Sequence, residues 1–88
     1  PLPGKEIVLD IAEGRSVARF HYVIAGIEKL KLPFGELETL KLVKKPEPGD
    51  DRGTEIWLAP RHHNLVARVL VTEKDGTRLD QLAIRMPE

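Results

Sequence analysis

Apolar and polar side chains alternate along most of this 88-residue chain, in runs that are separated by turn-forming residues. A period of two is typical of β-strands, because successive side chains point to opposite faces of a sheet. The run at residues 54–59 contains the only tryptophan, Trp57, and has further apolar residues, Ile56 and Leu58, on its other face. A strand that is apolar on both faces usually lies inside a sheet, so we expect the neighbouring runs to pair with it on both sides.

Other alternating runs predict the remaining strands. They occupy residues 5–12, 17–24, 37–43, 65–73 and 77–85. Residues 25–32 are less regular, because Gly26 interrupts them, and a glycine inside a strand pattern indicates a bulge or a break with a new short strand beyond it. A helix over residues 23–32 also fits the spacing, but no N-cap residue precedes it, and we favour a strand.

Two connections have clear turn chemistry. Residues 45–53 contain two prolines, two glycines and several charges, which indicates a long loop between two paired strands. Asp75-Gly76 separates the last two runs, and this dipeptide supplies the positive φ that a tight hairpin requires. If Glu73 faces Thr77 in that hairpin, the register places Val71 opposite Leu79.

Together these patterns predict an all-β fold, an antiparallel meander of about six strands that forms a strongly twisted sheet or an open half-barrel. The length fits one β domain over residues 1–88, and a domain of this size buries only somewhat more than ~60% of its unfolded surface. Because the chain starts Pro-Leu-Pro without a methionine, we expect it to be a piece of a longer protein. The missing part, or a homodimer, would then cover the apolar face of the sheet.

Composition argues against several partners. Fourteen basic and fourteen acidic residues are interleaved, whereas nucleic-acid-binding proteins usually present a basic stripe, so no nucleic-acid partner is expected. No run approaches the ~18 apolar residues of a transmembrane helix. The lack of cysteine excludes thiolate metal sites, and the adjacent His62 and His63 would point in opposite directions on an extended chain. We expect no metal and no other cofactor.

Catalytic motifs are also missing from the sequence. Ser16 is the only serine and has no Gly-x-Ser-x-Gly pattern around it. Glu36 and Glu38 share a strand face, and paired carboxylates could serve acid–base chemistry, but salt pairing with lysines or arginines is the simpler explanation. We expect that the protein is not an enzyme.

Three segments carry a family resemblance. Residues 34–43 (FGELETLKLV), 54–60 (TEIWLAP), and 65–68 followed by 72–76 (LVAR and TEKDG) have an order and spacing that resemble the C-terminal half of the bacterial domain-of-unknown-function 3108 family. The resemblance covers roughly the last two thirds of the chain, although residues 64–68 lack the aromatic residue and the proline that are typical there. It implies the C-terminal fragment of an exported, periplasmic protein, with a curved sheet similar to that of periplasmic lipoprotein carriers.

The function that we favour from the sequence is a non-enzymatic envelope domain that binds an apolar or lipid-like ligand in the concave face of its sheet. The residues assigned to that ligand site are Trp57, Leu40, Leu42, Leu58, Leu70 and Leu82. The same side chains could instead form the plain core of a small sandwich. The alternative function is a structural or protein-interaction module that recruits another chain through an exposed strand edge.

Overall fold

A computed structural model describes residues 3–85 and shows one sheet of six strands. Each strand pairs antiparallel with the next in sequence, and a short 3-10 helix, η1 (Pro60–His62), connects the fourth strand to the fifth. The strands are β1 (Glu6–Glu13), β2 (Ser16–Leu32), β3 (Gly35–Lys44), β4 (Gly53–Ala59), β5 (Leu65–Thr72) and β6 (Arg78–Leu82). The predicted all-β antiparallel meander is therefore confirmed, and the tryptophan strand β4 lies inside the sheet.

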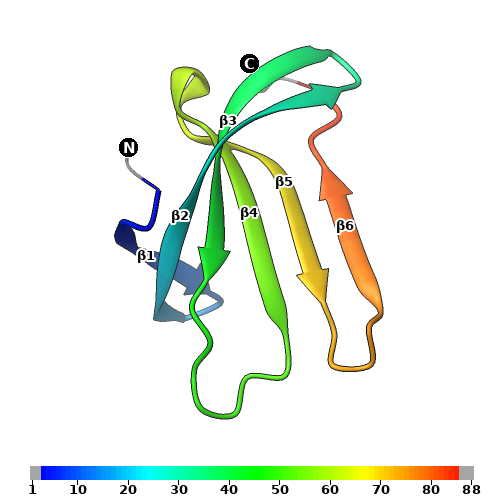
Figure 1. Cartoon of the computed structure of the whole chain (residues 1–88). Helices are drawn as coiled ribbons and strands as arrows, with labels where there is room; N and C mark the ends of the chain where they lie inside the picture. Colours follow the sequence, from blue (N-terminus) through cyan, green and yellow to red (C-terminus); the bar gives the residue numbers. More distant parts are fainter. Residues whose placement is uncertain (1–2, 86–88) are drawn as a thin grey trace.

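The sheet is strongly twisted and open (Figure 1). Its strand order, β1-β2-β3-β4-β5-β6, leaves β1 and β6 as edge strands, so the sheet does not close into a barrel. Within residues 3–85, no second layer of helices or strands lies over either face (Figure 1). The described chain also contains no helix with the length and apolar character needed to cross a membrane.

The hairpin between β5 and β6 has the register that the aspartate–glycine signal predicts. Gly76 has a φ of 90°, and its N–H donates to the Glu73 carbonyl at 3.0 Å. The Glu73 N–H donates to the Thr77 carbonyl at 2.7 Å, and Val71 pairs with Leu79. A glycine reaches this positive φ without a steric penalty, and the tight turn then fixes the strand pairing.

The segment around Gly26 forms one continuous strand with a bulge, rather than two strands with a break between them. β2 is 17 residues long, and its pairing with β3 shifts by one residue between Ile24 and Gly26. Gly26 has a φ of 148°, which residues with a side chain rarely adopt. Because of this shift, Ile24 pairs with Leu42 on one face of the sheet, whereas Glu28 pairs with Thr39 on the opposite face.

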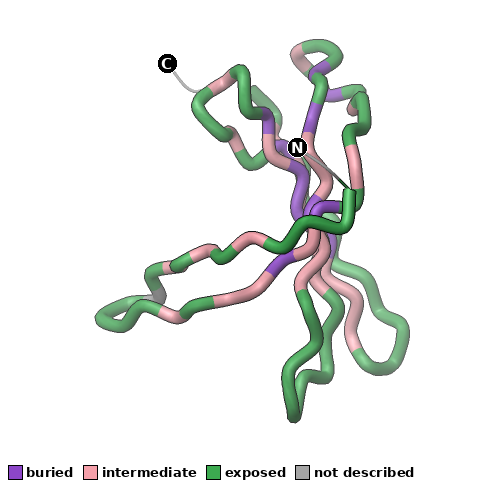
Figure 2. Tube along the Cα trace, turned by 60° about the vertical axis from the view of Figure 1, so that its left-hand side comes forward, coloured by how far each residue is buried: buried purple, intermediate pink, exposed green. Residues whose placement is uncertain are grey.

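Apolar clusters lie on both faces of the sheet. The Tyr22 cluster contains the buried Tyr22, Ile24, Leu42 and Ile56, against which the half-buried Ile7, Leu9, Phe20, Leu40 and Leu58 pack. The Leu37 cluster, on the opposite face, contains the buried Leu32, Leu37, Ala59 and Ala67 together with Leu30, Phe34 and Leu65. We call these two sides the Tyr22 face and the Trp57 face. Buried residues gather toward the middle of the molecule, and the ends of the hairpins are exposed (Figure 2).

Candidate functional site

The six side chains that the sequence assigns to a ligand site do not lie together. Leu40, Leu42 and Leu58 are on the Tyr22 face, whereas Trp57, Leu70 and Leu82 are on the Trp57 face. Consecutive residues of a strand point to opposite faces, so a single pocket on one face cannot be lined by both groups.

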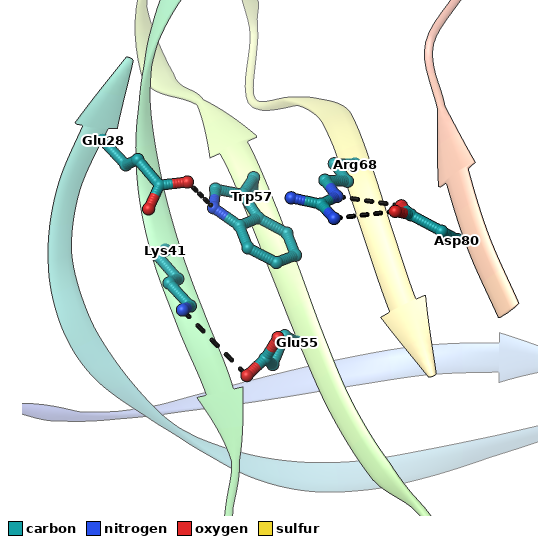
Figure 3. Close-up of polar contacts among 6 residues, drawn as sticks. All are labelled: Glu28, Lys41, Glu55, Trp57, Arg68 and Asp80. Carbon is teal, nitrogen blue, oxygen red and sulfur yellow. Dashed lines mark hydrogen bonds and ion pairs between the residues drawn. The ribbon is translucent and has the colours of Figure 1, made fainter. Parts of the chain in front are cut away.

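Trp57 is enclosed by charged side chains from neighbouring strands (Figure 3). The residue is 2% exposed, and its Nε1–H donates to Glu28 Oε2 at 2.7 Å. Lys41 Nζ lies 5.2 Å and Arg68 Cζ lies 4.6 Å from the centre of the indole ring, so both cations interact with its π-system. Arg68 in turn donates two hydrogen bonds to Asp80, at 2.8 and 2.7 Å.

These charged groups also stabilise one another. The hydrogen bonds from Arg68 hold the pKa of Asp80 below its ordinary value, and the same bonds raise the pKa of Arg68. Lys41 Nζ lies 4.0 Å from Glu55 Oε1. The stems of Lys41 and Arg68 are aliphatic, so they shield the indole ring from water while their charged ends reach acidic partners. The indole ring of Trp57 is thus enclosed by the chain's own side chains.

The Tyr22 face carries a pocket of ≈ 440 Å³ at the end of the sheet where the β3–β4 loop lies. Its apolar floor includes Ile11, Phe20 and Tyr22, and its charged rim includes Lys44 and Asp50. Pockets that bind small molecules typically measure about 300–1,000 Å³ and combine an apolar lining with a few polar groups. The size of this pocket falls within that range, and its lining combines three apolar or aromatic side chains with five polar or charged ones.

Strand pairing brings the floor together. Tyr22 pairs with Ile7 of β1 on one side and with Lys44 of β3 on the other. Phe20 lies two residues before Tyr22 on β2 and therefore on the same face. Tyr22 is 2% exposed, and its burial raises the pKa of the phenol.

The rim is held by a tight turn in the β3–β4 loop. The Asp50 N–H donates to the Glu47 carbonyl at 2.9 Å, and Asp50 Oδ2 accepts hydrogen bonds from the Glu47 N–H at 2.9 Å and from Lys44 Nζ at 2.6 Å. The Lys44 bond is the main reason that the pKa of Asp50 lies below its ordinary value. Lys44 Nζ also lies 5.2 Å from the centre of the Phe20 ring. This ammonium group therefore joins the charged rim to the aromatic floor.

Sequence reasoning missed the residues that line this pocket. Phe20 and Tyr22 lie two residues apart in the run at residues 17–24, so a strand there places both on one face, which is a weak signal for an aromatic surface. Nothing in the sequence indicates that the loop at residues 45–53 folds beside that surface. The contact depends on Lys44 and Asp50, whose pairing across six residues is a tertiary feature.

The histidines lie outside this pocket. His21 Nδ1 is 3.0 Å from Glu6 Oε1, and Lys45 Nζ is 3.1 Å from the other oxygen of the same carboxylate. His63 has a φ of 55° at the end of η1, and His62 precedes it in that helix. Within residues 3–85, no group of three or more histidine, cysteine, aspartate or glutamate side chains is placed to hold a metal ion.

Comparison with known proteins identifies a family. The family described as "Protein of unknown function (DUF3108)" matches residues 1–82. The match includes the β1–β2 hairpin, so it extends upstream of the two thirds of the chain that carry the sequence resemblance. No curated protein and no solved structure matches the chain. The match covers nearly the whole sequence, and the chain therefore belongs to the DUF3108 family of proteins of unknown function.

Proposed function

We propose that this chain is a non-enzymatic binding domain of the bacterial periplasm, which holds an apolar or lipid-like ligand against the Tyr22 face. The observation that carries the proposal is the pocket beside Phe20 and Tyr22, with its apolar floor and charged rim. A ligand with an alkyl or aromatic part and one polar end would match both features. The periplasmic location is supported by the resemblance of residues 34–43 and 54–60 to an exported family.

Apolar burial would supply most of the binding free energy. Phe20 is only half-buried, although it packs against the Tyr22 cluster, so a ligand on the floor removes its remaining surface from water. A ligand that buries about six methylene groups gains about 5 kcal/mol at ~0.8 kcal/mol each. This gain corresponds to a dissociation constant of about 0.2 mM before the cost of association, and contacts with the floor and rim would add to it.

The charged rim would orient the ligand. Lys44 has a side chain that is 12% exposed, and its ion pair with Asp50 borders the apolar floor. A polar end group could accept a hydrogen bond from Lys44 or donate one to Asp50, while the apolar part lies along Phe20. Polar groups at this position would fix the direction of the ligand more than they raise its affinity.

Displacement of a fluorescent dye tests this proposal. Dodecanoate is titrated into the protein with bound 1-anilinonaphthalene-8-sulfonate, and we expect saturable displacement. Phe20→Ser and Ile11→Ser each remove part of the floor, and each should weaken dodecanoate binding at least about fivefold, as expected for the loss of one to two buried methylene equivalents. Circular dichroism identifies any variant that does not fold.

Ile27→Ser is the matched control. Ile27 is 60% exposed and pairs with Leu40 on the same face, but it lies outside the pocket. Its replacement should change dodecanoate binding less than about twofold, because no floor contact is lost. Equal weakening by all three variants, or no saturable displacement from the parent protein, would contradict the proposal.

An interaction module is the second candidate, and one observation favours it. All five residues of β6 are exposed, and this strand is an edge of the sheet. Edge strands present unpaired backbone groups, and another chain can bind them by extending the sheet.

A further inference from the structure

Strand β6 is an exposed edge of the sheet. Its five residues, Arg78–Leu82, are all exposed, and Leu79 and Leu82 keep 55% and 47% of their surface accessible. Proteins protect edge strands by short length, charged side chains, prolines, bulges or a covering segment. β6 is five residues long and carries Arg78 and Asp80, but it contains no proline, and its pairing with β5 shows no bulge.

Every second residue of β6 directs its backbone toward the open edge. The Ala83 N–H, one residue beyond the strand, donates to the Ala67 carbonyl of β5 at 2.9 Å. In an antiparallel ladder such bonded positions recur at alternate residues, so the odd-numbered residues of β6 bond to β5. The even-numbered residues therefore present their N–H and C=O groups to the open edge, and these are Arg78, Asp80 and Leu82.

We propose that β6 binds β6 of a second copy of this chain, edge to edge and antiparallel, around a two-fold axis at Leu79. In this register Arg78 and the partner's Asp80 form a backbone hydrogen-bonded pair, and symmetry forms the same pair a second time. Leu79 faces the partner's Leu79 between these two pairs. The two sheets then continue as one across the dimer.

Charge selects this register from its neighbours. Arg78 lies opposite the partner's Asp80 in both pairs, and opposite charges at facing positions stabilise a sheet. An axis at Asp80 would instead place two carboxylates opposite each other, which is unfavourable. A two-fold axis that passes between two residues would place side chains from opposite faces of the sheet opposite each other. An axis at Gln81 would place Asp80 opposite the partner's Leu82, so both ion pairs would be lost.

Both charged groups have capacity for a new partner. Within residues 3–85, Arg78 forms no ion pair with an acidic side chain. Asp80 accepts two hydrogen bonds from Arg68, and a carboxylate has about four acceptor positions. The partner's Arg78 can therefore bind Asp80 while its bonds to Arg68 remain.

The other edge strand, β1, does not place opposite charges in the same way when it pairs with itself. The Ile24 N–H donates to the Lys5 carbonyl at 2.8 Å, so the even-numbered residues of β1 direct their backbone groups outward. Two of them, Glu6 and Asp10, are acidic, and in a symmetric pairing around Val8 they would face each other. Charge therefore disfavours pairing of β1 around Val8, whereas it favours pairing of β6 around Leu79.

Cysteine cross-linking tests both the dimer and its register, because the native chain contains no cysteine. In Leu79→Cys, the two cysteines of the dimer occupy a facing position that is not hydrogen-bonded, where Cα atoms are about 4.5 Å apart. This separation lies within the range of about 4.4–6.8 Å that a disulfide accepts. We expect rapid formation of a covalent dimer under mild oxidation of the dilute protein, measured by intact mass spectrometry.

Gln81→Cys is the matched control, since it lies on the same exposed strand and the same face. The proposed register places its cysteine four residues from the partner's copy, about 13 Å along the strand, so it should cross-link at least about fivefold less. Adding Arg78→Glu to Leu79→Cys should lower the yield, because two acids would then face each other. Equal cross-linking at both positions, preferential cross-linking at position 81, or no covalent dimer from either variant would overturn the proposal. These outcomes do not depend on whether the pocket binds a ligand.

Discussion

The two faces of this sheet are shielded from water in different ways. On the Trp57 face, Glu28, Lys41 and Arg68 surround the indole ring and leave it 2% exposed. On the Tyr22 face, Phe20 remains half-buried beside a pocket of ≈ 440 Å³. An aromatic ring that the chain's own charged side chains enclose offers no surface to a ligand, whereas the half-buried Phe20 does. Binding beside Phe20 would therefore bury additional apolar surface.

Truncation of adjacent residues of β4 should have the largest effect and should differ between the faces. Trp57→Ala removes an enclosed ring, so we expect it to lower the free energy of unfolding by about 3–5 kcal/mol. Leu58→Ala removes a half-buried side chain from the Tyr22 face, and we expect a loss of about 1–2 kcal/mol. Urea denaturation followed by circular dichroism measures both values.

Trp57→Phe separates the packing of the aromatic ring from the hydrogen bond that the indole N–H donates. It keeps an aromatic ring between Lys41 and Arg68 but leaves Glu28 without its hydrogen-bond donor, so its cost should be smaller, about 1–2 kcal/mol. If Leu58→Ala costs as much as Trp57→Ala, the two faces do not differ in the way described.

Lowering the pH should have a smaller effect on stability, through the pair of Arg68 and Asp80 on the Trp57 face. Arg68 holds the pKa of Asp80 in the folded chain below the value of about 3.9 that aspartate has in an unfolded chain. The pair therefore contributes its full stability above that pH and loses it as the pH falls through the folded-state pKa, where the carboxyl becomes protonated in both states. Because both side chains of the pair remain partly exposed to water, the change will be modest.

Asp80→Asn removes the titrating group and isolates this effect. The difference in urea midpoint between the native protein and Asp80→Asn should shrink as the pH falls from about 5 to about 2. A difference that stays constant or grows on acidification would show that Asp80 is not stabilised by Arg68 in the folded chain.

Local sequence patterns predicted much of the fold correctly. The alternation in residues 54–59 identified β4, and the aspartate–glycine turn fixed the pairing of Val71 with Leu79. Both are short-range features, because the side-chain period and the turn geometry depend on a few neighbouring residues. The sequence also indicated an irregularity at Gly26, but it left open whether the strand breaks there. β2 is continuous because it pairs with the whole of β3, and this pairing is not visible in the local sequence.

The candidate site was harder to predict from the sequence. Placing Trp57 and Leu58 in one ligand site conflicts with their opposite directions on β4, and the structure puts them on different faces. The side chains that cover Trp57 come from other strands, so their contacts follow from register and twist rather than from spacing. The pocket likewise depends on the ion pair between Lys44 and Asp50, which positions the loop beside Phe20.

The most direct test of the difference between the faces is a two-dimensional NMR titration of the ¹⁵N-labelled protein with dodecanoate. Trp57 is the only tryptophan, so its indole N–H gives one signal that reports on the enclosed face. We predict saturable shifts of the backbone amides of Phe20, Tyr22 and Lys44, with the Trp57 indole signal unchanged. Shifts that centre on the Trp57 indole, or the same small shifts on both faces, would contradict the assignment of binding to the Tyr22 face.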